Sequence, residues 1–339
     1  MQSSFLSVEQ IHELFHSFVG IKVLVAGDVM VDTYLRGKVD RISPEAPVPV
    51  VALQQRDDML GGAANVALNL RSLGAEPILC SVIGDDDQGK KFLDLLDREG
   101  ISKEGILADR ERISTTKYRI IGNHMQMLRV DHEIDKDLSQ QQELSLLKKA
   151  EELTGKFNPS VIIFQDYNKG VLTPGVIRGI TALAGKAGIP VVVDPKKKNF
   201  EAYQSIRLFK PNLKEIREGL RISVDPASLE SLNHAAGLIH SSHNADLVMI
   251  TLSEEGIFIS DRKESSILKA HVRSVADVSG AGDTVISVAA LCIASGTAPG
   301  IMAAIANLAG GIVCEQVGVV PISREALLAE TISLAEHKD

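Results

Sequence analysis

The residues best placed to do chemistry are Gly280-Ala281-Gly282-Asp283. An apolar stretch with helical spacing follows them, so these small residues should begin a buried helix. The first N–H groups of a helix have no intrahelical partner, and this positive end attracts anions. A carboxylate beside an anion held there could act as the base in phosphoryl transfer to a hydroxyl. The alternative is a core helix in which Asp283 only stabilises the helix dipole.

A glycine pair, Gly61-Gly62, precedes another predicted helix, which carries Asn65 in its first turn. Paired glycines let a ligand approach the main chain, and an asparagine amide both donates and accepts hydrogen bonds. Tight packing at a helix N-terminus explains the same residues equally well. The motif alone therefore leaves both interpretations open.

Asn212 and Glu215 lie three residues apart at the start of a further predicted helix, so they share one face of it. Their oxygen atoms could orient a magnesium ion, most simply through water because that ion dehydrates reluctantly. They could also form a capping box, in which each side chain bonds to the other's backbone. Judged by itself, the pair favours the cap.

Several predicted strands end in polar residues: Asp28 after 22–26, Asp166-Tyr167-Asn168-Lys169-Gly170 after 161–164, and Asp194-Pro195-Lys196 after 191–193. Strands that are apolar on both faces belong in parallel sheets, whose carboxyl ends line the ligand crevice. Acids and lysines together at that edge suit a ligand with hydroxyls and a phosphate. Each group alone could be a solvated loop.

Composition excludes several classes of function. The 339 residues are 45% hydrophobic with a net charge of −8, and no basic run exceeds Lys196-Lys197-Lys198, which argues against nucleic-acid binding. No apolar run approaches the roughly 20 residues that span a bilayer, and the N-terminus lacks the pattern of a signal peptide. We interpret the three cysteines as thiols in the protein core, which is typical of a reducing compartment. We therefore expect a cytoplasmic protein without nucleic-acid or membrane partners.

The stretch His12-Glu13-Leu14-Phe15-His16 matches the H-E-x-x-H pattern of zinc proteases. No strand precedes it and no third ligand is spaced behind it. An ordinary amphipathic helix over 8–19 is therefore the favoured interpretation.

Strands and helices alternate along the chain, which predicts a doubly wound α/β fold. Further strands are predicted at 78–83, 208–209, 247–250 and 256–260, and helices at 63–73, 88–98, 141–153, 174–187, 213–220 and 226–240. Two pairs of β-rich segments, 33–39 with 48–54 and 112–121 with 125–130, have no helix between their members and predict a small antiparallel sheet inserted as a lid. No repeat or linker is evident, so residues 1–339 should form one domain that begins with an N-terminal helix over 1–20.

Over nearly its whole length the chain resembles the ribokinase (PfkB) family of carbohydrate kinases. Two signatures carry the likeness, one from Gly61-Gly62 through Asn65 and Gly74 to Gly84, the other from Asp277 to Ala290. Val288 and Ser253 stand where the family usually has small residues or glycine. The resemblance implies a ribokinase-like, mostly parallel sheet with helices on both faces and a small antiparallel β lid.

The resemblance also implies a role for each matching residue. Asp283 would be the general base, and the amides of Gly280, Ala281 and Gly282 would stabilise the transferring phosphoryl group. ATP and Mg²⁺ would be the cofactors, with a monovalent cation as a further candidate. Asn212 and Glu215 match the family's N-x-x-E magnesium motif, which reverses the preference for a cap. The resemblance assigns sugar contacts to Asp28, Gly61, Gly62, Asn65 and Asp166, and nucleotide contacts to Thr251, Gly256 and Asn307.

Within this family, the chain is most similar to bacterial heptose 7-phosphate kinases. The likeness rests on Arg41–Val50, Gln126–Asp131, Asp166–Gly170 and Gly282–Ile286. It implies phosphorylation of D-glycero-D-manno-heptose 7-phosphate at its anomeric hydroxyl, in ADP-heptose and lipopolysaccharide precursor synthesis. Candidates for binding the heptose and its phosphate are Gln126, Arg129, Lys169 and Lys196. The alternatives are another sugar or nucleoside kinase, or a non-catalytic sugar-binding regulator.

The resemblance carries two expectations about assembly. Some such kinases are fused to a C-terminal adenylyltransferase, and because this chain ends just after its kinase portion, a stand-alone kinase is expected. The lids of two subunits are expected to clasp each other in a homodimer, burying Val48, Val50, Ile120 or their neighbours.

Overall fold

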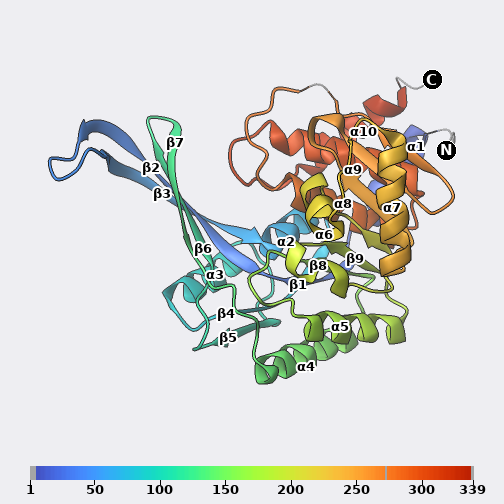
Figure 1. Ribbon diagram of the computed structural model, residues 1–339, viewed down its shortest axis with the longest axis horizontal. Helices are drawn as coiled ribbons and strands as arrows, with labels where there is room; N and C mark the ends of the chain where they lie inside the picture. The colour runs from blue at the N-terminus through green and yellow to red at the C-terminus, as the bar shows by residue number, and fades with distance from the viewer. Residues whose placement is uncertain (1–4, 272, 337–339) are drawn as a thin grey trace.

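A nine-stranded sheet between two layers of helices forms the body of the chain in the computed structural model, which describes residues 5–271 and 273–336 (Figure 1). In spatial order the strands are β13 (Ser265–Leu268), β12 (Ile257–Ser260), β11 (Leu247–Thr251), β10 (Leu208–Phe209), β9 (Val191–Asp194), β8 (Val161–Gln165), β1 (Lys22–Gly27), β4 (Glu76–Gly84) and β5 (Ile106–Asp109). Strand β12 is antiparallel to both of its neighbours, and the other pairs are parallel. The expected mostly parallel α/β sheet is confirmed.

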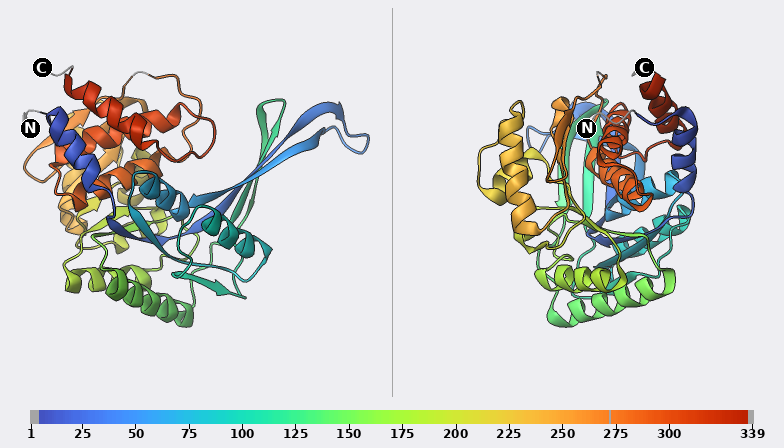
Figure 2. Two further views of the ribbon diagram at one scale, coloured as in Figure 1. Left: turned by 180° about the vertical axis from the view of Figure 1, so that it is seen from behind. Right: turned by 90° about the vertical axis from the view of Figure 1, so that its right-hand side faces the viewer.

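Alternate residues of the central strand β1 enter two separate cores. Val23 and Val25 pack on one face of the sheet, and Leu24 and Ala26 on the other. The first face is covered by α1 (Val8–Ser17), α2 (Ala63–Ser72), α3 (Asp87–Arg98), α8 (Ala281–Ala294), α9 (Pro299–Cys314) and α10 (Arg324–Glu336). The second is covered by α4 (Gln140–Phe157), α5 (Pro174–Ala187), α6 (Leu213–Leu220) and α7 (Leu229–His243). Figure 2 shows these helical layers on either side of the sheet.

Two hairpins project from one side of the body as a lid (Figures 1 and 2). They comprise β2 (Val29–Ile42), β3 (Pro49–Gly62), β6 (Thr116–Gly122) and β7 (Met125–His132), in the spatial order β3-β2-β6-β7. Each hairpin is antiparallel, as expected of the lid, but the two middle strands β2 and β6 pair in parallel. The parallel pairing is possible because β2 and β6 belong to different hairpins and no tight turn joins them.

The predicted element boundaries differ from the observed ones mainly at the lid and the C-terminal half. Helices α5 and α6 match their predictions, whereas α7 begins later than 226 because Ser228 caps it at Ser231. Strands β2 and β3 each have 14 residues and extend into the body, where residues 29–34 are buried. The sequence analysis did not predict β5, β13, α9 or α10.

Two further expectations concern metal and membrane binding. Helix α1 is amphipathic, with Ile11 and Phe15 in the core and both histidines of the H-E-x-x-H stretch exposed. Within residues 5–271 and 273–336, no three His, Cys, Asp or Glu side chains gather as a metal site. In the same ranges, no helix combines the length and apolar character needed to cross a bilayer.

Candidate active site

Polar side chains from neighbouring parallel strands meet at the carboxyl edge of the sheet. Asp28 follows β1, Gln165 ends β8, Asp194 ends β9 and Lys210 follows β10, and all four are buried. From β1 the strand order continues to β4 on one side, and from β8 it continues to β9 on the other. Doubly wound folds bind ligands at such a reversal of strand order. The predicted convergence at the strand ends is therefore present.

Helix α8 points its N-terminus at this edge. Gly280 is its N-cap with φ 84°, no side chain caps the helix, and Asp283 lies buried in its first turn. A Cβ atom at Gly280 would lie 3.0 Å from the Asn65 amide nitrogen, so glycine suits both the backbone conformation and the available space. The Ala281 amide makes one long bond, to the Val278 carbonyl at 3.4 Å, but no side chain caps this end, and its amides favour an anion.

The Asp283 carboxylate accepts hydrogen bonds from three side chains. Asn65 Nδ2 donates to Oδ2 at 2.7 Å, while Gln165 Nε2 and Tyr167 Oη donate to Oδ1 at 3.0 and 2.7 Å. These donors come from α2, the end of β8 and the loop that follows it. They fix the carboxylate rotamer and leave one of its roughly four lone-pair sites able to accept a proton.

Burial sets the proton affinity of this carboxylate. Desolvation raises the pKa of Asp283 to about 6, against the opposing effect of the bonds from Asn65 and Tyr167. Burial and the neighbouring Asp283 raise the pKa of Tyr167 well above its usual value, so its hydroxyl remains a donor. A carboxylate with a pKa near neutrality suits a general base.

An ion pair stands next to Asp283. Lys210 Nζ lies 3.0 Å from Asp194 Oδ2, and both side chains are almost fully buried. Gln165 Nε2 donates to the same Asp194 oxygen at 3.2 Å and so joins this pair to Asp283. A Cβ at Gly282 would lie 3.7 Å from both Asp194 Oδ2 and Lys210 Nζ. The pair therefore borders the N-terminus of α8, where Lys210 adds positive charge.

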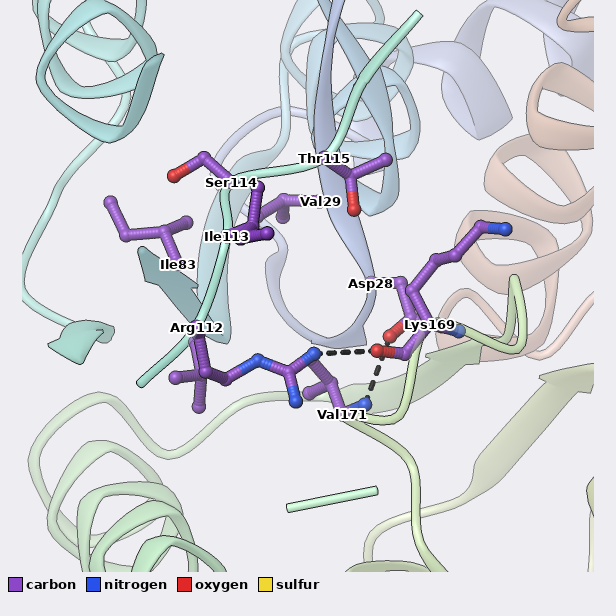
Figure 3. Close-up of a pocket in the computed structure, with 10 residues that line it drawn as sticks. Asp28, Val29, Ile83, Arg112, Ile113, Ser114, Thr115, Lys169 and Val171 are labelled. Atoms are coloured by element: carbon purple, nitrogen blue, oxygen red, sulfur yellow. Dashed lines mark hydrogen bonds between the residues drawn. The ribbon is translucent and has the colours of Figure 1, made fainter. Parts of the chain in front are cut away.

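Asp28 organises the loop after β8. Its carboxylate accepts hydrogen bonds from the backbone N–H groups of Tyr167, Lys169 and Val171 at 2.9, 3.1 and 3.0 Å. Figure 3 shows the bond from Val171, together with the Arg112 guanidinium bonded to the Lys169 carbonyl at 2.6 Å. The Asp28 carboxylate was expected to accept hydrogen bonds from sugar hydroxyls. Three of its lone pairs instead accept bonds from the protein backbone.

Asp166 lies beneath the same loop. Tyr203 Oη and Asn199 Nδ2 donate to its Oδ2 at 2.8 and 3.1 Å, and the Asn168 amide donates to Oδ1. Burial, reinforced by the charge of Asp28, raises the pKa of Asp166 to about 6. The residue shapes the loop that carries Tyr167 and Lys169.

The glycine pair allows close packing where the lid joins the body. A Cβ at Gly61 would lie 2.1 Å from Asp32 Oδ2, and one at Gly62 would lie 2.4 Å from the Asp28 carbonyl oxygen. Gly62 also has φ 61°, a conformation that disfavours other residues. The pair therefore brings α2, and Asn65 with it, against the two acids.

Asn212 and Glu215 form a capping box at the start of α6. Asn212 Oδ1 accepts from the Glu215 amide at 2.9 Å, and Glu215 Oε2 accepts from the Asn212 amide at 2.8 Å. The other carboxylate oxygen pairs with Lys196. Burial alone would lower the pKa of Lys196, but Asp194 and Glu215 raise it above its ordinary value. The local cap is therefore present, and each carboxylate oxygen retains capacity to accept from water.

The residues expected to contact the nucleotide lie toward β11 and β12. Thr251 ends β11 and bridges to Asn212, while Asn307 of α9 donates to the Lys269 carbonyl at 2.8 Å. Gly256 has φ 97°, and a Cβ there would lie 2.0 Å from the Leu268 carbonyl oxygen. Ser253 adopts φ 55°, the left-handed region that glycine occupies most easily.

Gln126 and Arg129 lie on β7, apart from the residues gathered around Asp283. Every residue of β7 is exposed, and Gln126 pairs with Ile121 beside the outer turn of the hairpin. Arg129 forms an ion pair with Asp131 at 3.0 Å. Across residues 5–271 and 273–336, no hydrogen bond or ion pair joins Gln126 or Arg129 to another predicted site residue.

The sequence analysis did not assign roles to Gln165, Tyr167 or Lys210. Tyr167 lies inside the singled-out Asp166–Gly170 segment, and Lys210 follows a predicted strand, so both had a positional signal. Their contacts with Asp283 and Asp194 join residues far apart in the chain, which no local pattern reveals.

Comparison with known proteins identifies the family to which the chain belongs. The family model described as "pfkB family carbohydrate kinase" matches residues 21–326. The chain is 39% identical over 335 residues to a protein of Caulobacter sp. (strain K31), and 41% identical over 331 residues to one of Methylobacillus flagellatus, each named bifunctional protein HldE. The alignments cover 96% and 97% of this chain but 66% of each relative, slightly less than two thirds.

Solved structures share the fold at low sequence identity. Phosphofructokinase-2 from Escherichia coli in complex with fructose-6-phosphate has a TM-score of 0.75 at 17% identity, covering 94% of this chain and 99% of its own. Ribokinase from Arabidopsis thaliana complexed with ribose and ATP has a TM-score of 0.70 at 16% identity, covering 92% of this chain and 99% of its own. A structure of the Escherichia coli enzyme in complex with potassium has a TM-score of 0.74 at 19% identity, covering 94% of this chain and 99% of its own. These similarities confirm the ribokinase-like fold.

The first prediction concerns Asp283. A carbon-detected NMR titration should give the Asp283 carboxyl a pKa of about 6. Tyr167→Phe should raise that pKa further, because it removes a donor to the charged form. As a matched control, Tyr203→Phe removes a hydroxyl from Asp166 and should leave the Asp283 titration unchanged. A midpoint near the ordinary aspartate value, or one indifferent to Tyr167→Phe, would contradict this account of the carboxylate.

Proposed function

Because the chain belongs to the pfkB family of carbohydrate kinases, we propose that it phosphorylates a heptose phosphate with ATP. Membership makes it a phosphotransferase that acts on a sugar hydroxyl. The proposed acceptor is the anomeric hydroxyl of D-glycero-D-manno-heptose 7-phosphate, and the product is the 1,7-bisphosphate. Identity of 39% and 41% to proteins named bifunctional protein HldE supports this choice.

The observation that carries the proposal is the placement of Asp283 in the uncapped first turn of α8. In the proposed reaction Asp283 takes the proton of the sugar hydroxyl while the sugar oxygen attacks the γ-phosphorus of ATP. The bond to the β,γ-bridging oxygen breaks, and ADP leaves. The amides of Ala281 and Gly282, together with Lys210, would stabilise the charge on the transferring group.

Carbohydrate kinases of this family use ATP and a divalent metal ion, and we assign magnesium to the capping box of α6. When bound, the ion would neutralise charge on the phosphate oxygens. Glu215 fits an indirect role, because its buried carboxylate keeps lone pairs free for water beyond its bonds to Asn212 and Lys196. Asn212 would hold that carboxylate in place through the same box.

We also propose that the lid forms a homodimer interface. Large apolar side chains are exposed along it: Ile42, Val48, Leu53, Met125, Met127, Leu128 and Val130. A projecting sheet of this size is marginal alone in water, and exposed apolar strands favour a partner. Two lids packed together would bury this surface and close over the sugar, excluding water that competes for the phosphoryl group.

Asp283→Asn should lower kcat by about 10²–10⁴-fold, because the side chain keeps its shape and loses its basicity. A steady-state assay with ATP and heptose 7-phosphate measures the loss, and nucleotide affinity should stay nearly unchanged. Asp246→Asn, an exposed substitution just before β11 at the opposite edge of the sheet, serves as the control. Near wild-type turnover in Asp283→Asn would exclude this residue as the base.

Glu215→Gln should raise the magnesium concentration needed for half-maximal rate. Glutamine still forms the capping box but lacks the charge that favours ordered metal-bound water. The control on the same helix is Glu218→Gln, whose exposed partner is Lys214. If the magnesium titration is the same for both variants, Asn212 and Glu215 have only a capping role.

Leu128→Asp should convert a dimer into monomers. It should also raise the rate at which ATP is hydrolysed by water without phosphorylation of the sugar. Leu128 is 55% exposed on β7, and a charge there would oppose burial between two lids. Sedimentation velocity at micromolar concentration measures the first effect, and ADP release the second. Leu144→Asp, at a residue 56% exposed on α4, is the matched control. A wild-type chain that sediments as an active monomer would refute the clasp.

A further inference from the structure

The base of the lid carries a lysine without an ion pair among the described residues. Lys117 lies half-buried on β6, next to Thr116, which is completely buried. Burial lowers the pKa of Lys117, and the nearby Asp32 only partly opposes that effect. An ammonium group held partly out of water is costly unless an anion compensates for the lost hydration.

The two lysines that the sequence analysis assigned to the sugar phosphate differ from Lys117 in this respect. Lys169 Nζ lies 2.6 Å from Glu133 Oε1, and Lys196 pairs with the buried Glu215. Each therefore already has a carboxylate partner within the chain. Lys117 has the greater capacity to bind an added anion.

Tyr167 connects Lys117 to the catalytic carboxylate. The Nζ atoms of Lys117 and Lys196 lie 5.5 and 5.7 Å from the centre of its ring, and its hydroxyl donates to Asp283. A ring face attracts an ammonium group more weakly than a carboxylate does and leaves its N–H donors available. One aromatic side chain thus contacts two ammonium groups with its ring and the Asp283 carboxylate with its hydroxyl.

We propose that Lys117 is a specificity-determining residue that binds the phosphate group already present on the sugar substrate. This inference rests on the proposed function and names the residue that distinguishes a sugar phosphate from a free sugar. Charge-assisted hydrogen bonds from the Lys117 ammonium group to phosphate oxygens would replace the hydration that the group loses on burial. Lys196 adds positive potential at the same ring, and Lys169 is an electrostatic neighbour of Lys117.

The position of Lys117 favours the sugar phosphate over the phosphates of ATP. Lys117 belongs to the lid, whose strand β2 follows β1, and its electrostatic neighbours include Lys169 in the loop after β8. The candidate nucleotide contacts follow β11, which β9 and β10 separate from β8. Because Lys117 is carried by the lid, its bond to phosphate would also hold the lid against the body.

Steady-state kinetics of Lys117→Gln test the inference with phosphorylated and unphosphorylated forms of the same sugar. The KM for the sugar phosphate should rise about 10- to 100-fold, the effect of losing a hydrogen bond to a charged group. The KM for the free sugar and the KM for ATP should not change. Lys117→Arg should restore much of the affinity because it keeps the charge. The control is Lys38→Gln, a lid lysine paired with Asp40 and 60% exposed.

Each outcome separates this inference from the proposed function. Equal losses with phosphorylated and free sugar, or a rise in the KM for ATP alone, would overturn the role of Lys117. A wild-type chain that uses another sugar phosphate would refute heptose as the substrate, and the same comparison would then be decisive with that sugar. A wild-type chain that prefers free sugars would overturn both proposals.

Discussion

The burial of one carboxylate governs the arrangement of this protein. Asp283 loses most of its hydration in the first turn of α8, which is costly unless hydrogen bonds and the helix dipole compensate. Asn65, Gln165 and Tyr167 supply those bonds from three separate elements. Helices α2 and α8 and the end of β8 must therefore keep fixed relative positions. The reactivity of the carboxylate and the packing around it have the same physical origin.

A second buried acid, Asp28, extends this constraint to the loop after β8. Asp28 engages three backbone amides of the loop after β8, and that loop carries both Tyr167 and Lys169. The glycine pair at 61–62 lets the lid strand and α2 approach Asp28 and Asp32 closely. Asp28 therefore acts through the loop that it holds, and a change at Asp28 would move Tyr167 and Lys169.

The lid differs from the body in how much apolar surface it leaves exposed. Its inner ends are buried with the sheet edge, while its outer strands expose apolar side chains to solvent. Such a surface stabilises a fold only when something covers it, whether substrate, a second lid or both. The large buried cores lie in the body, whereas the outer lid strands leave apolar side chains exposed.

Local sequence patterns were sufficient to predict most of the alternating strands and helices, the glycine-rich start of α8 and the position of Asp283 within it. They also identified the capping box of Asn212 and Glu215, because both partners lie within one helical turn. The hydrogen bond from Tyr167 to Asp283 joins residues 116 positions apart, and the parallel pairing of β2 with β6 joins two distant hairpins. The place of Lys117 over the Tyr167 ring likewise depends on how the lid meets the body. Periodicity and capping are encoded over a few residues, whereas these contacts follow from packing of the whole chain, so only the tertiary structure decides them.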